Sequence, residues 1–141
     1  MSNLTIQFEI VTPERVILSE QITQVVVPTK AGEITILPNH IPLVSSLTPG
    51  VIIAKKEDGS DVIMAMSGGF VEVLHGKVVI LADTAERADE LDEERIVEAR
   101  EVAKKAKEEV KHVDREQFAN ISAKLQKELA RERALKKWRK L

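Results

Sequence analysis

Glycine and proline stop abruptly partway along the chain. All six glycines lie between Gly32 and Gly76, all five prolines lie between Pro13 and Pro49, and residues 77–141 contain neither. Because both residue types interrupt regular structure and mark turns, their absence over so long a stretch favours long helices. The chain is therefore expected to have two parts, a turn-rich first part and a helical second part.

The first part has the pattern of short β-strands. Hydrophobic residues at positions 4, 6, 8 and 10 alternate with polar ones, which is typical of a half-buried strand. Two tight turns, Glu57–Ser60 with its Asp-Gly pair and His75–Lys77, separate further hydrophobic runs and indicate hairpins. Roughly eight to ten strands of this kind predict a sandwich or flattened barrel. No helical stretches alternate with them, as a doubly wound parallel sheet would require.

The second part has helical periodicity in two stretches. Small or hydrophobic residues recur at helical spacing from Ile96 to Val113 and again from Phe118 to Leu129. Between them, Asp114–Gln117 has the Asp-x-x-Gln form of a capping box, which predicts that a new helix starts there. We expect the two helices to pair as an antiparallel hairpin. Each helix has a narrow hydrophobic face, so the hairpin should be a marginal unit that can swing, extend or dock on a partner.

Composition narrows the functional classes. The net charge is -2 and only 3% of residues are aromatic, which disfavours nucleic acid as a partner. The absence of cysteine removes disulfides and thiolate zinc sites and is compatible with a reducing cytoplasm. The N-terminus lacks the features of a signal peptide, and no hydrophobic run approaches the ~20 residues that cross a bilayer. Membrane contact is therefore expected only through other proteins.

Signals for an enzyme are weak. His40, His75 and His112 lie in different predicted elements without the spacing of metal ligands, so no metal site is expected. The stretch Ser67–Gly69 lacks the Lys-Ser/Thr ending and the following helix of a phosphate loop, which favours a structural role at a strand start. No nucleophile has a base and an orienting group in a recognisable pattern, so no catalytic residue is predicted.

The C-terminal segment is basic. Between Lys127 and Leu141, seven Lys or Arg residues stand against two Glu residues. One interpretation is a solvated helix face whose cations suit the negative end of the helix dipole. The other is a docking surface for an acidic partner or a phosphate. The docking residues would then be Arg131, Arg133, Lys136, Lys137, Arg139 and Lys140.

Three motifs carry a resemblance to a known family. The stretches LPNHIPL at residues 37–43, SGGFVEV at 67–73 and ADTAE at 82–86 resemble, in their order and spacing, the epsilon subunit of the F-type ATP synthase. The resemblance covers the whole chain. It implies an α+β fold with a ten-stranded β-sandwich, or flattened barrel, over residues 1–86 and a C-terminal antiparallel two-helix hairpin over residues 87–141. It also implies a non-catalytic rotor subunit of the central stalk, which couples rotation to ATP synthesis.

The resemblance further implies partners and a location. The sandwich would bind the gamma subunit and rest on the c-ring, with Thr12, Glu33 and His40 facing the ring. Prolines 38 and 42 flank His40, and a rigid loop loses less entropy on docking. The alternative, that His40 is only a turn residue, stays open. As part of the complex, the protein would sit peripherally on the cytoplasmic face of the plasma membrane.

For the hairpin, the resemblance implies regulation. Folded against the sandwich, the hairpin would permit ATP hydrolysis. Extended along gamma, it would reach the catalytic head of alpha and beta subunits and block rotation, with the basic segment docked on an acidic loop of a beta subunit. A bistable element with few internal contacts suits such a switch.

Some relatives bind ATP at the folded hairpin through an Ile/Leu-Asp-x-x-Arg-Ala motif. Leu91, Asp92 and Arg95 match this motif, and Glu86 matches an upstream position associated with nucleotide binding. The resemblance thus implies no required cofactor and ATP as a possible regulatory ligand.

The chain departs from the nucleotide-binding pattern of these relatives at three positions, one in the motif and one further along each helix. Ile96 replaces the small alanine, Val102 stands where a basic residue is expected, and Lys137 aligns with an expected arginine. A lysine cannot reproduce the fork of a guanidinium group. Structural roles for the matching residues also remain open, with an acidic residue at a helix start and an ion pair within the hairpin. The alternative function is a free-standing nucleotide sensor that moves its hairpin when ATP binds.

Overall fold

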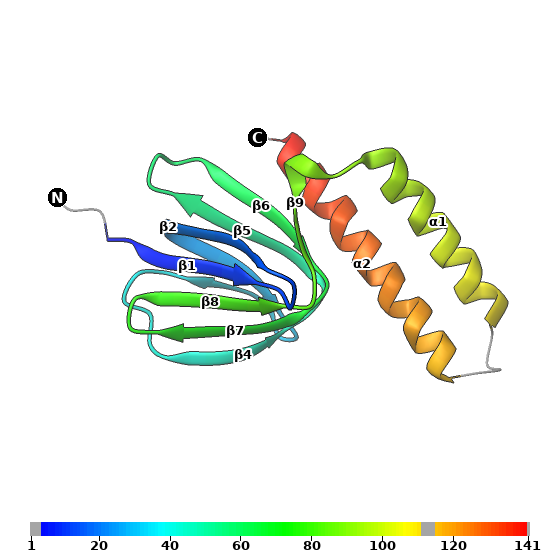
Figure 1. Cartoon of the computed structure of the whole chain (residues 1–141), viewed down its shortest axis with the longest axis horizontal. Coiled ribbons are helices and arrows are strands. Elements are labelled where there is room, and N and C mark those ends of the chain that lie inside the picture. The colour runs from blue at the N-terminus through cyan, green and yellow to red at the C-terminus, as the bar shows by residue number, and fades with distance from the viewer. Residues whose placement is uncertain (1–3, 111–114, 141) are drawn as a thin grey trace.

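The computed structural model describes residues 4–110 and 115–140, in which nine strands precede a short 3-10 helix and two α-helices (Figure 1). The strands are β1 (Ile6–Val11), β2 (Val16–Thr29), β3 (Gly32–Ile36), β4 (Leu43–Leu47), β5 (Gly50–Lys56), β6 (Asp61–Met66), β7 (Gly69–Leu74), β8 (Lys77–Ala82) and β9 (Ala85–Arg87). The helices are η1 (Ala88–Glu90), α1 (Glu93–Val110) and α2 (Arg115–Arg139). The predicted α+β fold, a β-sandwich followed by a helical hairpin, is confirmed, with nine strands in the described residues instead of the expected ten.

Strand β2 explains both the strand count and the barrel shape. Two runs that the sequence suggests as separate strands, residues 16–18 and 25–27, belong to this one strand of 14 residues. Its first half pairs with β1 and its second half with β3 and β5, with a register shift between Ile22 and Gln24. Such a bulge bends a strand and lets it serve two layers. Because β1, β8, β7, β4 and β2 form a hydrogen-bonded path that returns to β1, the sandwich is a flattened barrel.

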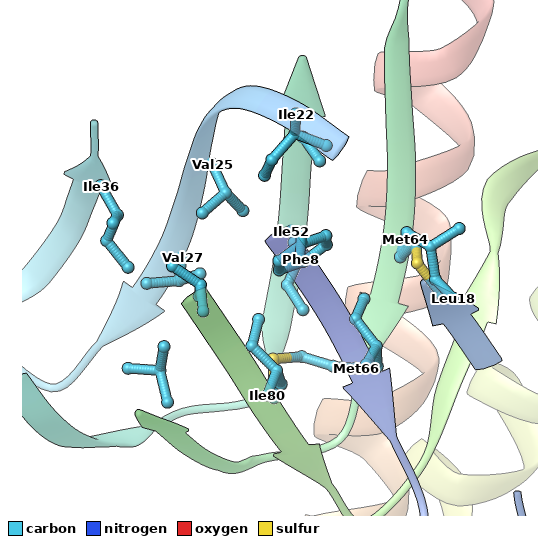
Figure 2. Close-up of a cluster of buried hydrophobic side chains, with 14 of the residues drawn as sticks. Phe8, Leu18, Ile22, Val25, Val27, Ile36, Ile52, Met64, Met66 and Ile80 are labelled. Atoms are coloured by element: carbon cyan, nitrogen blue, oxygen red, sulfur yellow. The ribbon is translucent and has the colours of Figure 1, made fainter. Parts of the chain in front are cut away.

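The core lies between the layers and follows the alternation in the sequence. Successive residues of β1 alternate between buried and partly buried, which places Phe8 and Ile10 inside. Figure 2 shows Phe8 among side chains that come from several strands, including Ile52 of β5 and Ile80 of β8. Burial of each such side chain contributes about 1.5–3 kcal/mol.

Helix α2 covers the outer face of β5 and β6. Five of the six residues of β6 are buried, because side chains on one face enter the core and those on the other contact α2. Figure 1 shows α2 between the sandwich and α1, so the hairpin is in a docked position. No helix in the described residues is long and hydrophobic enough to span a membrane.

The buried faces of the helices differ in part from expectation. On α1, Ile96 and Ala103 are buried as the spacing predicts. On α2, the prediction that a buried hydrophobic face begins at Phe118 is wrong, because this side chain is exposed. The centre of its ring lies 5.3 Å from the Lys107 ammonium group. The buried hydrophobic residues are Ala130, Ala134 and Leu135, because only the C-terminal half of α2 lies on the sandwich. The proposed capping residue Asp114, together with His112, Val113 and Leu141, lies outside the described residues.

Candidate functional site

A cavity of about 400 Å³ lies where β9, η1 and the two long helices meet. All four residues predicted for nucleotide binding line it: Glu86, Leu91, Asp92 and Arg95. Glu86 comes from β9, Leu91 and Asp92 immediately precede α1, and Arg95 lies in the first turn of α1. The docked hairpin therefore brings together the predicted residues, with Glu90, Glu128 and Arg131 beside them.

Two of these residues have structural roles at the start of α1. Asp92 Oδ1 accepts hydrogen bonds from the backbone N–H groups of Glu94 (3.1 Å) and Arg95 (3.4 Å), which caps the helix. Leu91 is partly buried and packs against a hydrophobic cluster under α2, which consists of Val51, Ile63, Ala65, Ala88 and Ala134. Arg95, in contrast, is exposed. The capping bonds account for Asp92 in the motif without any ligand.

Arg131 closes the cavity on the side of α2. Its Nη2 donates to Glu86 Oε1 on β9, and its Nη1 donates to Glu128 Oε1 at 2.5 Å. Burial alone would lower the pKa of Arg131, but the two carboxylates outweigh burial and raise the pKa above its usual value. Arg131 is one of the residues predicted to dock on an acidic partner when the hairpin is extended. In the docked hairpin its guanidinium group is held between two carboxylates. The sequence has no local pattern that predicts this ion pair, because Glu86 and Arg131 are 45 residues apart.

The rest of the basic segment is also partly neutralised. Arg139 forms an ion pair with Glu93 at the start of α1 (2.5 Å), and Lys136 pairs with Glu132 (3.2 Å). These contacts remove part of the free positive charge that the sequence suggests. Arg133, Lys137 and Lys140 are exposed and remain available on the surface of the described residues.

Another ion pair joins the two helices. Arg100 Nη1 of α1 donates to Glu132 Oε2 of α2 at 2.5 Å. This hydrogen bond raises the pKa of Arg100. Burial alone would raise the pKa of Glu132, but Lys136 and Arg100 outweigh burial and lower it below its usual value. The ion pair therefore favours the ionised form of Glu132. It links α1 to the C-terminal half of α2, which is the half that lies on the sandwich.

A second cavity, about 580 Å³ in volume, runs between α1 and α2. Its small side chains, Ala99, Ala103 and Ala106, belong to the small or hydrophobic residues that were predicted to recur at helical spacing from Ile96. Cationic side chains from both helices also line this cavity, and Glu128 lines it together with the first cavity. The residues lining both cavities are thus Arg95, Ala99 and Glu128.

The three predicted ring-facing residues do not gather at one end of the sandwich. Thr12 and Glu33 lie at the same end of the sandwich. Thr12 follows the last residue of β1, and the register of the paired strands aligns this end of β1 with Ala82 of β8, Gly69 of β7 and the start of β3, where Glu33 lies. His40 lies in the turn between the end of β3 and the start of β4, at the opposite end. Its backbone N–H donates to Leu37, and its Nδ1 lies 2.7 Å from the Ile41 carbonyl oxygen.

A hydrophobic surface on the outer face of β4, β7 and β8 was not predicted. Val44, Phe70 and Leu81 are 72%, 55% and 51% exposed, and Phe70 pairs with Leu81 across neighbouring strands. The sequence did carry a signal, because both alternating sets of positions in these strands contain hydrophobic residues. We call Val44, Phe70 and Leu81 the exposed sheet face.

The SGG motif has a structural explanation. Gly69 begins β7 with a φ of +148°, and a Cβ atom there would lie 2.0 Å from the Leu81 carbonyl oxygen. Ser67 Oγ accepts hydrogen bonds from the backbone and hydroxyl groups of Thr84 (3.0 and 2.8 Å). The predicted structural role at a strand start is confirmed. In the part of the chain that the structure describes, no group of acidic or histidine residues is arranged to hold a metal ion.

Comparisons with known proteins agree with this architecture. Residues 5–88 match the family model for the β-sandwich domain of the ATP synthase delta/epsilon chain, which defines the class. The ATP synthase epsilon chain of Dichelobacter nodosus is 48% identical over 99 residues, which cover 70% of this chain and 69% of the relative. The epsilon chain of Herpetosiphon aurantiacus is 52% identical over 103 residues, covering 73% and 75%.

Solved structures extend the likeness into the hairpin. A chain in a cryo-EM structure of the Euglena gracilis mitochondrial ATP synthase matches with a TM-score of 0.80 and 26% identity, covering 95% of this chain and 84% of that one. A chain of the Tetrahymena thermophila enzyme, with a TM-score of 0.62 and 12% identity, shares the fold. The chain therefore belongs to the ATP synthase epsilon-chain family, as its motifs predict. It is a non-catalytic subunit of that complex.

Proposed function

We propose that the protein is a rotor subunit of the central stalk, which binds the gamma subunit through its exposed sheet face. The supporting observation is that Phe70 and Leu81 lie uncovered on one layer of the sandwich, while α2 covers the outer face of β5 and β6 in the other. An uncovered hydrophobic surface of this kind is typical of a protein interface. The covered face is occupied by the chain's own hairpin and serves regulation.

Binding to gamma can be tested by placing charge on this surface. The variant Phe70→Glu with Leu81→Glu should fold, since both side chains are exposed, but should fail to co-purify with gamma. Leu4→Glu, at another exposed position, is the matched control and should co-purify normally. Normal recovery of gamma by the doubly substituted chain would contradict the assignment of this face.

We propose that the hairpin inhibits ATP hydrolysis when it leaves the sandwich and reaches the alpha/beta head. Undocking would separate Arg131 from Glu86, and exposed Arg133, Lys137 and Lys140 would supply positive charge for an acidic partner. A chain that ends at Leu91 should assemble and lose the inhibition. The shortened chain keeps Ala88, which is buried in the hydrophobic cluster under α2. Equal inhibition by the shortened and full chains would contradict the proposal.

We propose that the end of the sandwich with Thr12 and Glu33 contacts the c-ring and that His40 is a turn residue. The preceding residue, Asn39, adopts a positive φ of 65°, and the His40 ring meets a backbone oxygen of its own loop. Glu33→Ala should lower proton-coupled ATP synthesis in reconstituted vesicles, whereas His40→Ala should leave it near normal. The reverse order of effects would contradict this assignment. The subunit would lie peripherally on the cytoplasmic face of the plasma membrane, held there by the complex.

We propose ATP as a regulatory ligand of the cavity at Glu86, without a requirement for any cofactor. The support is the convergence of all four predicted residues on one cavity. Calorimetry with ATP should show weak binding that Arg95→Ala reduces further. Arg95 is the better choice for substitution, because Asp92 also caps α1. No heat at millimolar ATP would contradict this proposal, while the rotor function would stand. A free-standing nucleotide sensor is not favoured, because the chain belongs to a family of ATP synthase subunits.

A further inference from the structure

Glu128 is the one charged residue that is buried among the described residues, with 8% exposure. It lies on α2 and lines both the cavity at Glu86 and the cavity between the helices. A buried carboxylate is unfavourable unless a cation or hydrogen-bond donors compensate it. The position of Glu128 therefore requires an explanation in terms of its neighbours.

The compensating group is Arg131. Glu128 Oε1 accepts a hydrogen bond of 2.5 Å from Arg131 Nη1, while Glu128 Oε2 and Arg131 Nε are buried without a partner in the described residues. The other terminal nitrogen of Arg131 donates to Glu86. Both ends of the guanidinium fork are thus occupied by carboxylates of the chain itself.

The two carboxylates differ in what happens when the hairpin moves. Glu86 belongs to β9 and is left behind when α2 leaves the sandwich. Glu128 is three residues before Arg131 on the same helix and moves with it. Its contact with Arg131 is therefore available in the docked and the undocked hairpin.

We infer that Glu128 is a built-in anion that occupies Arg131 in place of a phosphate group and so weakens the binding of nucleotides at this cavity. The inference rests on the proposal that ATP is a ligand there. A phosphate would need the guanidinium fork, since paired N–H donors recognise phosphate and carboxylate in the same geometry. It would have to displace a carboxylate that is tethered one helical turn away. Glu128 also neutralises Arg131 in the undocked hairpin, which leaves inhibitory docking to Arg133, Lys137 and Lys140.

Calorimetry of the full chain with MgATP tests the inference. Glu128→Gln keeps the shape of the side chain and removes its charge, so it should tighten binding about tenfold or more, the factor expected when a strong competing charged hydrogen bond is lost. Glu132→Gln is the matched control, because Glu132 also pairs with an arginine but lines neither cavity. It should leave the affinity within about twofold of the parent. Adding Arg131→Gln to Glu128→Gln should abolish the gain.

The outcomes separate this inference from the proposals it rests on. ATP binding of equal strength by the parent and Glu128→Gln overturns the role of Glu128 and leaves ATP as a ligand. No binding by any variant overturns both, whereas the rotor function is tested on the complex and is untouched. Circular dichroism must show equal helix content in the parent and Glu128→Gln, and Glu128→Ala provides a second neutral variant if glutamine disturbs α2. In that case, failure of Glu128→Ala to bind ATP more tightly than the parent overturns the inference.

Discussion

Replacing Ala134 with leucine is expected to release the helical hairpin from the sandwich. Ala134 is fully buried on α2 and belongs to the cluster that includes Val51, Ile63 and Ala65 on β5 and β6. Leucine is a good helix former, so the substitution should leave α2 itself intact. The larger side chain has no space at this contact and must push the helix away from the sheet.

The size of the effect follows from the cost of overpacking a buried position. Added methylene groups in a well-packed site destabilise it by about 1–3 kcal/mol. Since each 1.4 kcal/mol changes an equilibrium about tenfold, the ratio of docked to undocked hairpin should fall by roughly fivefold to a hundredfold. Two of the three buried hydrophobic side chains of α2 are alanines, which contribute little hydrophobic free energy, so a large undocked population is expected.

A distance measurement between spin labels can detect this change. The chain contains no cysteine, so cysteines at Glu57 and Lys105, both exposed, would place one label on the sandwich and one on α1. Ala134→Leu should broaden the distance distribution and add longer distances. Ala123→Leu, the same change at an exposed position of α2, is the matched control and should keep the parental distribution. A parental distribution in Ala134→Leu would refute the assigned role of the alanine contact.

Three further outcomes are expected. Gly69→Ala should lower the free energy of unfolding of the sandwich by about 1–3 kcal/mol or more, because its Cβ would collide with the Leu81 carbonyl oxygen; an unchanged denaturant midpoint would contradict this. The pKa of Glu132 is lowered in the folded hairpin, so the stability from its bridge to Arg100 is complete above the usual Glu value of about 4.3 and is lost as the pH falls through the lower folded value. Helix content that melts at the same temperature near pH 6 and in this acidic range would argue against that contribution. Lys137→Glu, at an exposed position, should weaken inhibition of hydrolysis without affecting assembly, and unchanged inhibition would remove this residue from the docking surface.

The strands of the sandwich could be predicted because they depend on local patterns. The alternation that buries Phe8 and Ile10 is visible in the sequence, and so are the Asp-Gly turn and the hairpin at His75, whose positive φ of 45° suits a turn. The merging of two runs into β2 was not visible. Whether a strand bends between layers or breaks depends on partners far away in the sequence.

The docked face of α2 could not be predicted, because alanine carries little hydrophobic signal. Large hydrophobic residues suggest that the buried face includes Phe118. The residues buried against the sheet are Ala130 and Ala134 instead, and their small side chains allow α2 to lie close to the sheet. The same limit applies to the cavity. The motif identified Asp92 and its neighbours, but the pairing of Arg131 with Glu86 depends on docking of the hairpin and leaves no local pattern.

Rotation of this chain relative to the catalytic head would show directly whether it is part of the rotor. A probe attached through Glu57→Cys, an exposed position on the sandwich, would be followed in single complexes immobilised by the catalytic head during ATP hydrolysis. We expect the probe to rotate continuously in one direction, in step with a probe on the gamma subunit. A probe that stays fixed relative to the head while gamma turns would contradict this expectation.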